Sequence, residues 1–202
     1  GGDGETLLMN LDAEGVWAQV VRDAHDGRLA PRYHGACGTP QPGARPRRDL
    51  YRGKGYLPVA LLQFGRGCPY RCAFCAVGAY FDHRHHARPV AEVVAEIEAS
   101  GRRDLFFVDD NLVADPDATK ELLRALASLG VRWVSQASVD HTHDPEMLRL
   151  FAESGCLGNV IGFESLDPDS LREARKGPNL RASPAYADEV AALRAHHLQT
   201  WA

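Results

Sequence analysis

The sequence predicts an α/β protein in which parallel strands alternate with covering helices, as in part of a (β/α) barrel or in an open parallel sheet. Apolar runs of strand length recur after residue 57, and most are followed by apolar residues at helical spacing. Helix starts share an Asp-Pro or Ser-Pro signature, which combines an N-cap with proline at the first helical position. About four and a half strand–helix units are present, too few for a closed eight-unit barrel, so we expect a partial barrel or an open sheet.

The first 56 residues are expected to hold one helix and a linker. Residues 12–26 carry apolar side chains at helical spacing, and Gly27 follows as a C-terminal cap. Residues 28–56 are rich in Gly, Pro and Arg and have no sustained period, which is typical of a connection between domains. We therefore expect a domain boundary near Leu57, with residues 1–56 before it and residues 57–202 after it.

Strand–helix units make up the rest of the chain. The apolar runs expected to form buried strands are residues 59–64, 105–108, 132–137 and 160–163. The helical faces expected after the first three strands centre on residues 90–97, 122–129 and 147–151. The capping signatures are Asp115-Pro116, Asp144-Pro145, Asp167-Pro168 and Ser183-Pro184. Because the carboxyl ends of parallel strands share one edge of the sheet, ligands are expected at that edge.

Composition restricts the class of protein. With 202 residues, of which 45% are hydrophobic and 25% charged, the chain is expected to be a soluble globular protein with a core. A net charge of −4 provides no positive electrostatic potential for binding phosphates. Nucleic acid is therefore not implied, and a small-molecule partner is expected. No apolar run approaches the roughly 20 residues that span a bilayer, and we expect a cytoplasmic protein without a membrane partner. The start at Gly1-Gly2 and the apolar segment just beginning at the end indicate a piece of a longer protein.

The cysteines are the strongest chemical signal. There are five of them, an odd number with three crowded into eight positions: Cys37, Cys68, Cys72, Cys75 and Cys156. This arrangement is a poor disulfide framework and favours a metal cluster. Cys156, at the start of the fourth strand, is expected in the core, and Cys37 is expected to be a bystander in the linker.

The three crowded cysteines follow the first strand directly, at the edge where ligands are expected. A cubane of four irons is normally held by four thiolates, so a local trio leaves one iron open to an outside ligand. Gly65, Gly67 and Pro69 allow a short loop to wrap around such a cluster with its amides toward the sulfurs. These features favour an iron–sulfur site with an open, catalytic iron.

Other interpretations of the same cysteines remain open. The main one is a structural zinc site, for which His83, His85 or His86 supplies the fourth ligand. A redox pair of Cys72 and Cys75, or a set of buried unreactive thiols, is also compatible with the spacing.

The Cys-x3-Cys-x-Phe-Cys pattern after the first strand of a β/α series resembles the radical SAM superfamily. The resemblance implies that Cys68, Cys72 and Cys75 bind a 4Fe-4S cluster whose fourth iron chelates S-adenosylmethionine. One electron then breaks a carbon–sulfur bond and yields methionine and a 5′-deoxyadenosyl radical, which abstracts hydrogen from a substrate. It further implies a truncated barrel of the radical SAM type, a reductant such as flavodoxin or ferredoxin, and a backbone contact of Phe74 with the adenine.

Later strand ends carry residues that the resemblance assigns to the cofactor. Asp109 or Asp110 occupies the position that contacts the methionine ammonium, although both also suit a helix cap. Gln136 is a candidate for the methionine carboxylate or the ribose, or else a plain loop residue. The candidates at the fourth strand and beyond are Glu164 and Ser165 for the ribose hydroxyls, and Lys176 for the carboxylate or as a solvated charge.

The layout also resembles the branch of the superfamily that carries an N-terminal cobalamin-binding domain. The features are a Gly-rich start, the helix around Trp17, a Pro/Arg linker and then the cysteines. Residues 1–56 are then the C-terminal remnant of a cobalamin domain plus linker, and residues 57–202 a core that is incomplete at its C-terminus. Residues 23–27 are similar to the Asp-x-His-x-x-Gly corrin motif, but the glycine comes one position early and we reject them as a ligand.

This branch implies cobalamin in the full-length parent and methyl transfer to an unactivated carbon, by analogy. A radical cyclase or oxidoreductase uses the same layout and is the enzymatic alternative. From a different class of protein, a zinc-stabilised binding module is the remaining alternative, and iron content distinguishes it because zinc has no redox chemistry.

Overall fold

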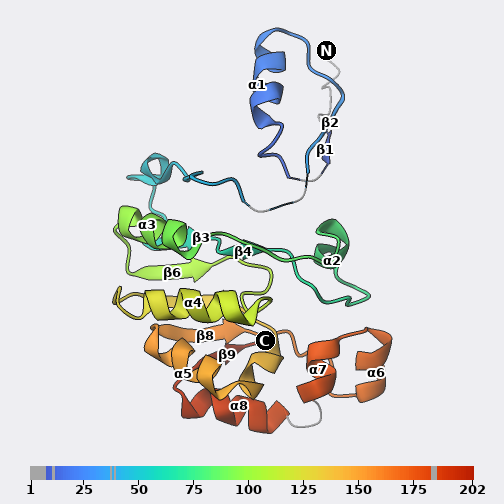
Figure 1. Ribbon diagram of the computed structural model, residues 1–202, viewed down its shortest axis with the longest axis vertical. Helices are drawn as coiled ribbons and strands as arrows, with labels where there is room; N and C mark the ends of the chain where they lie inside the picture. Colours follow the sequence, from blue (N-terminus) through green and yellow to red (C-terminus); the bar gives the residue numbers. More distant parts are fainter. Residues whose placement is uncertain (1–7, 11, 37, 39, 183–185) are drawn as a thin grey trace.

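The computed structural model describes residues 8–10, 12–36, 38, 40–182 and 186–202 (Figure 1). The strands are β1 (Leu8–Asn10), β2 (Arg32–His34), β3 (Val59–Leu62), β4 (Gly65–Arg66), β5 (His86–Ala87), β6 (Asp104–Phe107), β7 (Arg132–Gln136), β8 (Cys156–Val160) and β9 (Gln199–Trp201). The α-helices are α1 (Trp17–His25), α2 (Ala76–Tyr80), α3 (Val90–Ser100), α4 (Pro116–Leu126), α5 (Pro145–Glu153), α6 (Pro168–Glu173), α7 (Gly177–Ala182) and α8 (Tyr186–Ala195). Two 3-10 turns are η1 (Arg48–Tyr51) and η2 (Val139–His143).

A five-stranded parallel sheet of order β3-β6-β7-β8-β9 forms the body of the protein. Each strand pairs with the one that precedes it in this series, and the connections run through helices, as in successive units of a (β/α) barrel. Helices α3, α4, α5 and α8 pack beside one another along the sheet (Figure 1). The predicted α/β fold with parallel strands is therefore confirmed.

The core lies between this sheet and its helices. Trp133 at the centre packs edge-on against Phe107, with ring centroids 5.4 Å apart, and its indole N–H donates to the carbonyl of Ser154. The opposite face of the sheet carries apolar side chains with large exposed fractions, such as Leu61 at 58%. The two faces thus differ, and only one is covered within the described residues.

Capping explains where the helices after the sheet strands begin. The Asp115, Asp144 and Asp167 side chains each accept a backbone N–H at the start of α4, α5 and α6, and Pro follows each one. These three predicted helix starts are confirmed. The fourth signature, Ser183-Pro184, lies outside the described residues.

The fourth sheet strand begins earlier than its apolar run predicts. β8 covers Cys156–Val160, whereas the expected run was residues 160–163. The strand contains Gly158 and the fully buried Asn159, both poor strand formers. Asn159 is accommodated because its Nδ2 donates to Ser135 Oγ on β7 at 2.8 Å, a partner that is invisible in the sequence.

The N-terminal region also contains more strand than expected. β1 and β2 pair in parallel on either side of α1, so the segment forms a small β-α-β unit, and β2 falls inside the expected linker. Tyr33 on β2 is buried and donates its hydroxyl to Asp23 on α1 at 2.8 Å. This unit contacts the sheet domain through Arg66, which forms ion pairs with Asp12 at 3.1 Å and Glu14 at 2.7 Å.

Among the helices of the described residues, none has the length and apolarity needed to cross a membrane.

Candidate functional site

The cysteine loop, residues 65–75, joins the end of the first sheet strand to α2. It begins as β4, which pairs antiparallel with β5, and it ends at Cys75, the N-cap of α2. Gly67 has a φ of +84°, and a Cβ there would lie 2.2 Å from the carbonyl oxygen of Arg84, so this turn requires glycine. The thiols of Cys68, Cys72 and Cys75 are free and partly exposed.

The cysteine loop offers three thiol ligands for a metal centre. Three cysteines on one short loop match the ligands of an iron–sulfur cluster, in which each iron takes one thiolate.

Two of the histidines near the loop, His83 and His85, pack against glycines. The Nδ1 atom of His83 lies 3.1 Å from the carbonyl oxygen of Tyr70, and its ring fills the space beside Gly78. The ring of His85 lies against Gly65, and burial lowers its pKa. The three thiols thus fit the ligand set of a 4Fe-4S cluster, and the buried Nε2 atom of His85 has no hydrogen-bond partner among the described residues.

One side of the cysteine loop is held by the residues that follow β6. Asp109 is fully buried, and its two carboxylate oxygens accept the backbone N–H groups of Phe64 at 3.0 Å and Gly65 at 2.5 Å. Burial raises the pKa of Asp109 to about 7, although both N–H groups act to lower it. The exposed Asp110 accepts the N–H of Gly67 at 2.8 Å. The acidic pair thus shapes the loop, and Asp110 is the member that keeps a solvent-accessible carboxylate.

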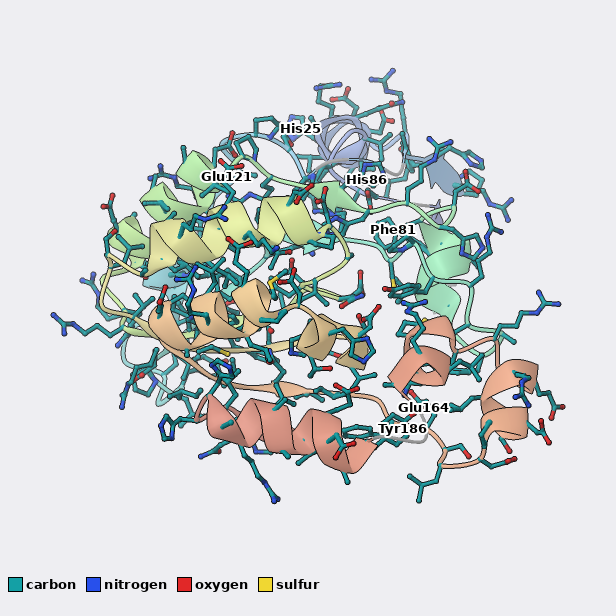
Figure 2. The ribbon with its side chains drawn as sticks, turned by 60° about the horizontal axis from the view of Figure 1, so that its bottom comes forward. His25, Phe81, His86, Glu121, Glu164 and Tyr186 are labelled. Carbon is teal, nitrogen blue, oxygen red and sulfur yellow. The ribbon has the colours of Figure 1, made fainter. Side chains whose placement is uncertain are left out.

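The other side of the loop faces the segment after β8. Glu164 has a φ of +62°, which is uncommon for a residue with a side chain. The Nζ atom of Lys176 donates to its carboxylate at 2.8 Å and lies 5.5 Å from the centroid of the Phe74 ring. Asn179, fully buried, donates to the carbonyls that precede Glu164, those of residues 162 and 163, both at 2.9 Å. Figure 2 labels Glu164 close to α7 and Phe81 beside α2.

A second set of contacts joins the loop to α6 and α7. The hydroxyl of Tyr70 donates to Asp140 of η2 at 2.7 Å, and Arg181 of α7 pairs with the same carboxylate at 2.5 Å. Burial and the neighbouring carboxylate raise the pKa of Tyr70 to about 12. The N–H of Ala73 also donates to the carbonyl of Ala174 at 2.8 Å. The helices that follow β8 are therefore docked directly on the cysteine loop.

Comparison with known families agrees with this arrangement. Residues 62–184, more than half of the chain, match the radical SAM superfamily. The chain belongs to this superfamily.

Two curated relatives illustrate its place among radical SAM proteins. The chain is 31% identical over 185 residues to the bacteriochlorophyllide d C-12(1)-methyltransferase of Chlorobaculum tepidum, covering 86% of this chain and 41% of that protein. It is 26% identical over 145 residues to the hopanoid C-2 methylase of Rhodopseudomonas palustris, covering 67% of this chain and 27% of that one. The chain thus spans less than half the length of the relatives it matches.

Solved structures share its fold. The radical S-adenosylmethionine methyltransferase TsrM from Kitasatospora setae, solved with tryptophan and a SAM analogue, superposes with a TM-score of 0.63 at 22% identity over 82% of this chain and 33% of that chain. The cobalamin-dependent S-adenosylmethionine radical enzyme OxsB gives a TM-score of 0.69 at 17% identity, over 94% of this chain and 32% of that chain. At this level of identity the likeness establishes the fold alone.

Several predicted site residues of this radical SAM chain lie around the cysteine loop. Phe74 and Lys176 are in contact, Lys176 pairs with Glu164, and the Lys176 charge lowers the pKa of Cys72 against the larger effect of burial, which raises it. Ser165 follows Glu164, but its hydroxyl accepts the N–H of Asp167 at 3.0 Å. Gln136 lies at the end of β7 with an exposed side chain.

Of the two remaining cysteines, one lies within the described residues. Cys156 is buried, burial raises its pKa, and its thiol contacts the carbonyl of Gly158 at 3.5 Å. Cys37 lies outside the described residues.

The contacting residues that sequence reasoning did not assign are Tyr70, Asn111, Asp140, Asn179 and Arg181. Asn111 continues the Asp109-Asp110 run, which was a usable signal.

Proposed function

We propose that this chain is the cofactor-binding core of a radical SAM enzyme, in which Cys68, Cys72 and Cys75 hold a 4Fe-4S cluster beside a site for S-adenosylmethionine. The observation that carries the proposal is the placement of all three thiols on one loop. That loop leaves the carboxyl edge of the parallel sheet and faces the Glu164–Lys176 pair.

When bound, such a cluster supplies the electron that cleaves a carbon–sulfur bond of S-adenosylmethionine, giving methionine and a 5′-deoxyadenosyl radical. The residues of this chain bind and orient the cofactor. Asp110 accepts from the methionine ammonium, because both oxygens of Asp109 are already occupied by backbone N–H groups. The backbone at Phe74 approaches the adenine.

The Glu164–Lys176 pair serves the polar parts of the same cofactor. Only Oε1 of Glu164 is engaged by Lys176, so its other oxygen is available to a ribose hydroxyl, with Ser165 and Gln136 as further hydrogen-bonding groups. Lys176 is 15% exposed and lies beside Cys72, where its charge suits the methionine carboxylate. Lys176 is thus assigned to a ligand group of opposite charge, and Glu164 to a hydroxyl that donates a hydrogen bond.

For the whole protein we propose methyl transfer to a small-molecule substrate, with cobalamin held by the parent's N-terminal domain. The relatives named as methyltransferases support the reaction class. The parallel β1-α1-β2 unit supports residues 1–56 as the remnant of a cobalamin domain plus linker and residues 57–202 as the core. A flavodoxin or ferredoxin is the proposed reductant.

Paramagnetic resonance tests the proposal. After anaerobic reconstitution and reduction, addition of S-adenosylmethionine should change the spectrum of the cluster, because an amino–carboxylate chelate replaces the ligand on the open iron. In Asp110→Asn the change should require roughly 10-fold to 100-fold more S-adenosylmethionine at equal iron content, from loss of a charge-assisted bond of about 1.5–3 kcal/mol. A loaded wild-type cluster whose spectrum ignores saturating S-adenosylmethionine would contradict the proposal.

A further inference from the structure

We propose that Asn111 is a positioning residue that donates an N–H···S hydrogen bond to Cys68 and thereby raises the reduction potential of the cluster. This inference rests on the proposed function, since it concerns the cluster that the cysteine loop would hold. The proposed role of Asn111 differs from helix capping and from binding of S-adenosylmethionine.

The contact itself joins two segments that are distant in sequence. Asn111 follows Asp109 and Asp110 after β6, and its side chain is almost fully covered, with 4% of the residue exposed. Its Nδ2 atom lies 3.9 Å from the Sγ atom of Cys68, a long separation for a hydrogen bond to sulfur. The Asn111 side chain therefore brings a donor from the segment after β6 to the first cysteine of the loop.

The orientation of the Asn111 amide is fixed by its neighbour Ser138, which follows β7. The backbone N–H of Ser138 donates to Oδ1 of Asn111 at 3.0 Å, and a backbone N–H can only donate. The carbonyl of the amide must then point toward Ser138, which leaves the NH2 group to face Cys68 and the Ser138 hydroxyl, at 3.2 Å. The N–H groups, rather than the oxygen, are thus presented to the sulfur.

A donor at this position has a definite electrostatic consequence. Reduction adds negative charge to the cluster and its thiolates, and hydrogen bonds to the sulfurs are among the factors that set cluster potentials. An N–H aimed at a sulfur in a partly buried site favours the more negative, reduced state. Asn111 donates through its side chain, so its contribution can be removed by substitution.

The test compares Asn111→Leu with Ser138→Ala in the cluster-loaded protein. Leucine has nearly the shape of asparagine but no donor, whereas Ser138→Ala removes only the hydroxyl and keeps the backbone N–H that orients the amide. In redox titrations followed by paramagnetic resonance, Asn111→Leu should shift the potential to more negative values. The ratio of reduced to oxidised cluster at a fixed potential should fall about tenfold, equivalent to about 59 mV for a one-electron couple. Ser138→Ala should titrate like the wild type.

A purely structural role for Asn111 would leave the potential unchanged, and a loaded Asn111→Leu protein with the wild-type potential would overturn the inference. If Asn111→Leu fails to bind iron, a measurement on the wild-type protein still tests the inference. With asparagine side chains labelled with 15N, pulsed paramagnetic resonance should detect a nitrogen coupled to the reduced cluster that is lost in Asn111→Asp. Absence of that coupling in the loaded wild type would equally overturn the inference. A wild type that binds no iron would instead refute the cluster assignment itself, and this inference with it.

Discussion

The cysteine loop is held between two regions of different character. On the sheet side, Asp109 and Asn111 are buried and bond to its backbone and to a sulfur. On the helical side, Lys176 and Arg181 form ion pairs that are partly exposed, with Arg181 53% exposed. Buried hydrogen bonds are costly to break, whereas exposed ion pairs contribute little. The sheet side is therefore expected to fix the shape of the loop, whereas the ion pairs of the helical side can be exchanged for contacts with a ligand.

The largest effect on the free energy of unfolding is expected at Asp109, on the sheet side. Asp109→Ala leaves two buried backbone N–H groups without partners, so the free energy of unfolding should fall by about 3 kcal/mol. Asp110→Ala is the matched control, because it removes a single exposed acceptor and should cost less than about 1 kcal/mol. Urea unfolding of the cluster-free protein measures both. Equal losses in the two variants would mean that the buried carboxylate does not fix the loop.

A pH dependence of somewhat smaller size should arise from the same residue. The pKa of Asp109 is raised to about 7 in the folded protein, against about 4 in the unfolded chain. Between these values the folded state binds more protons than the unfolded state, so this group's contribution to stability is present at low pH and is lost as the pH rises toward 7. From pH 5 to pH 8 the loss should be roughly 2–3 kcal/mol. Asp109→Asn should lack that component, and an unchanged pH profile in this variant would contradict it.

On the helical side, the expected effect moves from stability to ligand affinity. Lys176→Met should weaken binding of S-adenosylmethionine about tenfold, through loss of a charge opposite the carboxylate, while unfolding changes little. Lys120→Met is the matched control, because Lys120 is likewise a partly buried, ion-paired lysine, bonded to Asp144 and Glu146, but it lies on α4. Equilibrium binding to the cluster-loaded variants separates the two. Wild-type affinity in Lys176→Met would remove this residue from the site.

The smallest effect is expected at Arg181. Arg181→Gln breaks an ion pair with Asp140 and a cation–π contact with the Tyr70 ring, 5.9 Å from its centroid. Because the side chain is largely exposed, the cost in unfolding free energy should stay below about 1 kcal/mol. Iron content should be unchanged. A loss of iron in this variant would show that the helical side also fixes the loop, which would erase the contrast between the two regions.

The predictable parts of this molecule are those written in local patterns. The first three sheet strands, the Asp-Pro helix starts and the spacing of the cysteines are each local patterns, read from periodicity, capping or metal chemistry. The contacts that were missed join distant residues: Asn111 and Cys68 are 43 positions apart, and Tyr70 and Asp140 are 70 apart. Such contacts depend on the order and register of the strands, which a single sequence does not specify. The buried Asn159 shows the same limit, since its partner lies on the neighbouring strand.

The central claim is that three cysteines of one loop bind an iron–sulfur cluster, and iron content tests it most directly. Cys72→Ala should lose the 4Fe-4S signal in Mössbauer and paramagnetic resonance spectra after anaerobic reconstitution. The double variant Cys37→Ala with Cys156→Ala should retain the wild-type iron per folded protein, because Cys156 is buried in the core, where its thiol donates to the carbonyl of Gly158. The opposite pattern, with iron retained in Cys72→Ala and lost in the double variant, would contradict the assignment of the cluster to this loop.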